Sequence, residues 1–114
     1  MSDEQLSVTV SDRGSDTLVS VSGELDFGTT PGFLEVTQPL VEAGHPVVLD
    51  LAELGFCDSS GLGALVRLHK LADGAGGSLC LARLRPQLES TIRLTMLHRL
   101  FRIRDDVPTA DDPA

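Results

Sequence analysis

The 114-residue sequence predicts a single α/β domain in which a mixed β-sheet with an N-terminal hairpin packs against α-helices. Two segments near the N-terminus alternate between apolar and polar residues, as half-buried strands do. Beyond them, segments with helical periodicity alternate with short apolar runs, which is typical of strand and helix units packed in layers. The length suits one hydrophobic core, and no internal repeat or linker divides the chain.

The first two strands are expected at residues 5–11, QLSVTVS, and 16–23, DTLVSVSG. In the first segment Leu6, Val8 and Val10 share one face, and in the second Thr17, Val19 and Val21 share one face while Leu18 lies on the other. The residues between them, DRGS, have the composition of a turn. The two strands should therefore pair as a hairpin.

A first helix is expected to begin at Thr29 or Thr30 and to end near Ala43. A threonine side chain can cap the first turn, and Pro31 fits there because first-turn N–H groups have no acceptor within the helix. Pro39 conflicts with this pattern, because a proline this far into a helix kinks or divides it.

The remaining elements follow in alternation. PVVLDL, residues 46–51, is apolar on both faces and is predicted as a central parallel strand that ends near Leu51. After a short loop, a second helix begins at Ser59 and ends at a glycine-rich stretch, and residues 78–84 form the next strand.

A third helix is expected from Pro86, with Leu88, Ile92 and Met96 on one apolar face. The run LFRI, residues 100–103, is compatible with a short final strand. The predicted order is β-β-α-β-α-β-α followed by this short strand.

Charge and composition exclude several classes of function. A net charge of −8 and a pI near 4.6 disfavour nucleic acid and anionic membranes as partners and favour a basic protein surface. No apolar run approaches the ~20 residues that cross a bilayer, and no leader is recognisable, so we expect a cytoplasmic protein without direct membrane insertion. Cys57 and Cys80 lack metal-ligand spacing and are expected to be reduced thiols, so neither a metal nor a cofactor is expected.

Polar residues stand directly before the second helix in GFCDSSGLGALV, residues 55–66. Asp58, Ser59, Ser60 and Gly61 lie where a strand gives way to a helix, which is where sites gather in open α/β sheets. The first-turn amides and the helix dipole favour anions there. The glycines are expected to leave the serine hydroxyl open to another molecule.

Three interpretations of this segment compete. In the first, Asp58 or Ser59 only caps the helix, which explains one residue and not four. In the second, Ser59 or Ser60 is the nucleophile of a small serine hydrolase. The candidate bases are His45, His69 and His98. This is disfavoured because there is no GxSxG elbow and His69 lies about two and a half turns along the helix from Ser60.

In the third interpretation, one serine is the substrate of a kinase. A phosphate would add roughly 1.5 to 2 negative charges at neutral pH beside Asp58. The helix N-terminus can accept that charge without unfolding, so phosphorylation would change a surface that another protein recognises.

Three stretches together resemble the STAS domain family, specifically its stand-alone bacterial anti-sigma factor antagonists. They are GELD at 23–26, VVLDL at 47–51 and FCDSSGLGALVRLHKLA at 56–72. The resemblance implies a non-enzymatic module that binds an anti-sigma factor and so releases a sigma factor. The anti-sigma factor is commonly also a serine kinase whose phosphorylation of the antagonist ends binding, until a phosphatase restores it.

The resemblance also assigns roles by position. It makes Ser59 the phosphoacceptor, with Asp58, Ser60 and Gly61 completing the motif. Asp26, which ends GELD, should lie near the serine and contribute to the partner surface or to phosphorylation. Within the same family, the alternative is a STAS-type subunit of a signalling or transporter-associated assembly, in which the serine is only a cap.

Two departures from the family pattern concern the C-terminal part. The family usually has a glycine where the third helix closes, whereas this chain has Thr95-Met96-Leu97. Many relatives end with another amphipathic helix, but residues 105–114, DDVPTADDPA, lack that periodicity. We therefore expect a STAS domain at residues 1–104 and an acidic, flexible tail at 105–114.

Overall fold

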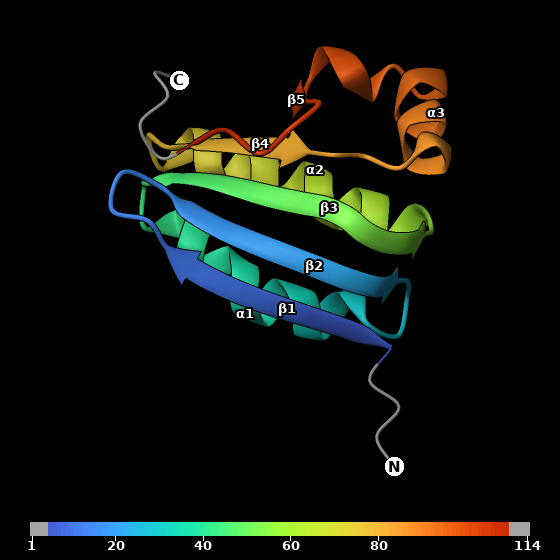
Figure 1. Cartoon of the computed structure of the whole chain (residues 1–114), viewed down its shortest axis with the longest axis horizontal. Helices are drawn as coiled ribbons and strands as arrows, with labels where there is room; N and C mark the ends of the chain where they lie inside the picture. Colours follow the sequence, from blue (N-terminus) through green and yellow to red (C-terminus); the bar gives the residue numbers. More distant parts are fainter. Residues whose placement is uncertain (1–4, 110–114) are drawn as a thin grey trace.

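The computed structural model describes residues 5–109 and confirms one α/β unit with a mixed five-stranded sheet (Figure 1). The predicted element order is also confirmed, including the short final strand. The elements are β1 (Leu6–Asp12), β2 (Thr17–Leu25), α1 (Thr30–Glu42), β3 (Pro46–Cys57), α2 (Ser59–Gly74), β4 (Ser78–Ala82), α3 (Pro86–Leu94), the 3-10 turn η1 (Leu97–Arg99) and β5 (Arg102–Arg104).

The strands lie side by side in the order β1-β2-β3-β4-β5. The β1–β2 pair is the antiparallel hairpin expected from the alternation, and each later pair is parallel. In Figure 1, α1 and α2 lie behind the sheet, while α3 lies beyond the end of β4. The carboxyl ends of β2 and β3 therefore meet at one edge of the sheet, next to the start of α2.

The core between the sheet and the helices is almost entirely aliphatic. Alternate residues of the central strands are buried against α1 and α2, as are the apolar positions of α2. Fully buried members include Val19, Val21, Leu49, Leu51, Leu65, Leu68 and Leu81. The predicted kink does not divide α1, which runs through Pro39; Pro39 and Glu35 are exposed, so solvent can reach the carbonyl that lacks its helical donor.

The predicted end of β3 is wrong. The strand continues to Cys57 instead of ending near Leu51, so no loop separates it from the second helix. The reason is tertiary: β2 extends to Leu25, and its pairing with β3 continues to the Leu25–Cys57 pair. Register shifts near Ser22 and Gly23 accommodate the irregular part of this ladder.

The third helix and the strand before it are shorter than predicted. α3 ends at Leu94, and Met96 is 52% exposed with a left-handed φ of 64°, so its predicted place on the apolar face is wrong. This is the conformation that glycine adopts most easily, at the position where the family usually has glycine.

β4 ends at Ala82 because Arg83 has a φ of 58°. The Arg83 guanidinium donates to both oxygens of Asp50, at 3.0 Å and 2.6 Å, and these bonds hold the pKa of that carboxyl below its usual value.

The C-terminal expectations are tested in part. Within the described chain, residues 105–109 form neither helix nor strand, and Val107 and Pro108 are half-buried. Residues 110–114 lie outside the described range, so the flexible tail and the boundary after Arg104 stay predictions. No helix among residues 5–109 is both long and apolar enough to cross a membrane.

Candidate functional site

Asp58 is the residue that organises the start of α2. It has an extended backbone, and its Oδ1 accepts a hydrogen bond from the Gly61 amide at 3.0 Å, which makes it the N-cap. Its Oδ2 accepts the amide of Phe27 at 3.1 Å, and its own N–H donates to the Leu25 carbonyl at 3.1 Å. One side chain thus caps a helix and connects it to the turn that follows β2.

Asp26 shapes that neighbouring turn. Its Oδ1 accepts hydrogen bonds from the amides of Gly28 at 2.9 Å and Thr29 at 3.1 Å. Its carbonyl accepts the Thr30 amide at 2.9 Å and the Thr30 hydroxyl at 2.7 Å, at the start of α1. Asp26 has the local role of an Asx turn at a helix entry, and its hydrogen-bond partners within residues 5–109 all belong to its own turn.

Sequence spacing alone does not show that these two turns are neighbours, but the structure does. The Phe27–Asp58 hydrogen bond joins positions 31 residues apart, and it brings the end of GELD beside the start of DSSG. Asp26 is thus near the serine turn without a hydrogen bond to Ser59 among residues 5–109.

Ser59 is the exposed first residue of α2, and Ser60 beside it is half-buried. Within the described chain, the Ser59 hydroxyl has no hydrogen-bond partner. The first-turn amides of both serines have no acceptor in the helix, and they give this end a partial positive charge. An anion next to these amides would be favoured by their positive charge.

Gly61 has a different role from the expected one. It is buried, and a Cβ added there would lie 2.7 Å from the Leu25 carbonyl oxygen and 2.8 Å from the Cys57 sulfur. Gly61 is therefore required by the close approach of α2 to the ends of β2 and β3. Gly63 faces open space, with nothing within 4 Å of an added Cβ, and it alone fits the expectation of an open surface.

The histidines do not assemble a hydrolase site with the serines. His69 packs edge-on against Phe101, with ring centroids 6.1 Å apart, and its Nδ1 is buried without a hydrogen-bond partner. His98 Nδ1 is in the same situation, and His45 lies before the first residue of β3, at the opposite end of that strand. Among residues 5–109, no group of His, Cys, Asp or Glu could hold a metal ion.

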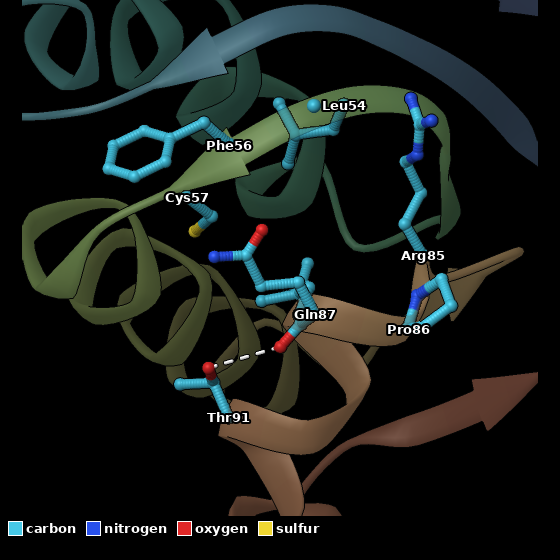
Figure 2. A pocket seen from close by; sticks show the side chains of 9 residues that line it. Leu54, Phe56, Cys57, Arg85, Pro86, Gln87 and Thr91 are labelled. Atoms are coloured by element: carbon cyan, nitrogen blue, oxygen red, sulfur yellow. Dashed lines mark hydrogen bonds between the residues drawn. The ribbon is translucent and has the colours of Figure 1, made fainter.

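A cavity of about 220 Å³ lies beside the site, between the end of β3 and the start of α3 (Figure 2). Its lining includes Leu54, Phe56, Cys57, Arg85 and Gln87. Burial, followed by the negative charge of Asp58, raises the pKa of the Cys57 thiol to about 11. This thiol is therefore protonated and a poor nucleophile at neutral pH.

Sequence reasoning did not single out Phe27. Its side chain is 82% exposed, although its backbone amide is held by Asp58. The available signal was an aromatic residue inside the turn sequence LDFGTT, where no strand or helix face would bury it.

Comparisons with known proteins agree with this geometry. A model of the STAS domain family matches residues 7–110. The anti-sigma-B factor antagonist of Bacillus subtilis (strain 168) is 32% identical over 98 residues, which cover 86% of this chain and 90% of that protein. An anti-sigma factor antagonist from Mycobacterium paratuberculosis superposes with a TM-score of 0.84 at 25% identity, covering 96% of this chain and 93% of that one.

A further neighbour shares the fold at lower identity. The Bacillus cell fate determinant SpoIIAA in its phosphorylated form superposes with a TM-score of 0.70 at 16% identity. The match covers 90% of this chain and 93% of that one.

Proposed function

Because the chain belongs to the STAS domain family, we propose that it is an anti-sigma factor antagonist whose binding is switched off by phosphorylation of Ser59. The unphosphorylated protein binds an anti-sigma factor that is also a serine kinase, and this binding releases a sigma factor. A phosphatase that acts on phosphorylated Ser59 resets the switch. Since the released sigma factor acts on RNA polymerase, the cytoplasm is the compartment that we assign.

The observation that supports Ser59 as the phosphoacceptor is its position. It is exposed at the first turn of α2 and has no hydrogen-bond partner within residues 5–109, whereas the Asp58 carboxylate is engaged with two backbone amides. A kinase would therefore meet a free hydroxyl on a rigid turn. The protein acts as a non-enzymatic regulator, so Ser59 is a substrate and not a nucleophile.

The switch follows from electrostatics at a binding surface. Phosphate adds nearly two negative charges to a protein whose net charge is −8. An unpaired charge in a desolvated contact costs about 2–5 kcal/mol, which corresponds to a loss of roughly 30-fold or more in affinity. The turn itself stays folded because the α2 amides accept the anion.

The test uses the anti-sigma-type serine kinases of the source organism, purified as a panel, with binding and phosphopeptide mass spectrometry as readouts. Wild type should bind one of them and be phosphorylated on Ser59, Ser59→Ala should bind without being phosphorylated, and Ser59→Asp should bind at least about 30-fold more weakly. Ser90→Asp, on the exposed side of α3, controls for added charge and should bind like wild type.

Two results contradict the proposal. If no kinase in the panel binds or phosphorylates the wild type, the antagonist function is wrong. If Ser59→Asp binds as tightly as wild type, the protein is a constitutive subunit and Ser59 is only part of the first turn of α2.

A further inference from the structure

Phe27 is unusual among the aromatic residues of this protein because of its high exposure to solvent. The sequence has four phenylalanines, and two of them, Phe33 and Phe101, are almost fully buried. Phe27 is 82% exposed on a turn, so it forgoes the roughly 1.5–3 kcal/mol that burial of such a side chain contributes. No part of the described fold uses this ring.

The backbone that carries Phe27 is nevertheless fixed. Its amide donates to Asp58 Oδ2, and the next two amides donate to Asp26 Oδ1. The Thr29 hydroxyl also donates to the Glu24 carbonyl at 2.9 Å, which closes the turn on the other side. An aromatic ring on a pre-ordered turn loses little conformational entropy on binding, which is what an interface anchor requires.

The surroundings of Phe27 match the anatomy of a protein interface. Glu24 is exposed, while Asp26 and Asp58 are half-buried, so the ring projects from an acidic neighbourhood. Buried aromatic anchors within a polar rim account for most of the affinity in many interfaces. The complementary partner surface is an apolar pocket bordered by basic side chains.

Phe27 and Ser59 belong to one continuous surface. Asp58 hydrogen-bonds the Phe27 amide and is the residue immediately before Ser59. Both residues are exposed, so a protein that encloses the Ser59 hydroxyl lies next to the turn that carries Phe27.

On this basis we infer that Phe27 is the aromatic anchor of the antagonist, inserting into an apolar pocket of the kinase-type anti-sigma factor. This inference rests on the proposed function and adds the residue that supplies affinity. Ser59 then decides whether the surface binds, and Phe27 decides how tightly it binds.

The experiment compares Phe27→Ala with Leu94→Ala against the panel member that binds wild type. Leu94 is the matched control because it is 85% exposed and lies at the end of α3. Phe27→Ala should weaken binding at least tenfold, mainly through faster dissociation, whereas Leu94→Ala should change it less than twofold. Both variants should keep the wild-type melting temperature because neither side chain is packed.

The outcomes separate this inference from the function on which it rests. If Ser59→Asp weakens binding but Phe27→Ala binds like wild type, the anchor is wrong and the switch stands. If wild type binds no kinase, both are wrong. If sedimentation shows a wild-type dimer that Phe27→Ala dissociates while kinase binding is unchanged, the ring serves self-association and the inference is overturned.

Discussion

Helices α2 and α3 each follow a parallel strand and begin beside the same cavity at the carboxyl end of the sheet, but the residues that precede their first turns have opposite charges. Asp58 caps α2 with its side chain and lies where the helix dipole favours a negative charge. Arg85 precedes α3 with no side-chain cap hydrogen bond, and its positive charge is at the unfavourable end of the dipole.

The difference shows that position at this edge of the sheet is not enough to make a site. α3 begins with Pro86, which removes one unpaired N–H group but connects the helix to nothing else. Asp58 instead connects α2 to the Phe27 turn, so the start of α2 and the turn that follows β2 are held together by one side chain. Of the two helix starts, that of α2 thus places an exposed serine next to a hydrogen-bonded turn.

The largest effect should come from filling the contact between α2 and the strands. Gly61→Ala should lower the free energy of unfolding by about 3 kcal/mol, because the new Cβ would overlap the Leu25 carbonyl and the Cys57 sulfur. Gly63→Ala, in the same helix, should raise it by about 0.5–1 kcal/mol because the Cβ meets nothing and alanine favours the helix. Urea denaturation of both variants measures the difference, and equal effects would contradict the close packing of α2 at Gly61.

Removing the cap should have the next largest effect. Asp58→Ala leaves the amides of Gly61 and Phe27 without their acceptor, and should cost about 1–2 kcal/mol of unfolding free energy. Asp58→Asn keeps an acceptor for one of the two amides but turns its NH2 group toward the other, so it should lose about half of that amount or more. If Asp58→Ala unfolds at the same urea concentration as wild type, the two hydrogen bonds to Asp58 do not stabilise the fold.

The smallest effect should come from giving α3 the chemistry of α2. Arg85→Asp introduces a cap and a favourable charge at the extended residue before Pro86, and should stabilise the protein by about 0.5–1 kcal/mol. Arg85→Gln removes the charge without adding a short cap and serves as the control. A melting temperature that stays at the wild-type value in Arg85→Asp would show that the start of α3 gains nothing from capping.

Local sequence signals predicted the element order and the start of α2 at Ser59, because alternation and capping act within a few residues. The end of β3 was not predictable in that way. Glu53 and Phe56 do not have the pattern of a strand, and they pair with Ser22 and Glu24 because β2 lies alongside them through two register shifts. Such pairing depends on residues about 30 positions away.

Some residues of the candidate site were predictable from the sequence and others were not. Residue order before an apolar helix left Asp58 and Ser59 as possible caps, and the structure selects Asp58. The roles of Ser59 and Asp26 came from resemblance to a family. Phe27 was missed, although an aromatic residue inside the turn sequence LDFGTT is a local signal of exposure. Met96 was misplaced because helical spacing does not reveal that α3 stops at Leu94.

The hydrogen bond between Phe27 and Asp58 also bears on how the protein is made. The two residues meet where β2 and β3 pair in parallel, which is a non-local contact between positions 31 residues apart. A kinase that contacts Phe27 and Ser59 together would therefore not bind a nascent or misfolded chain. Only copies of the protein that have completed folding would then be bound and phosphorylated.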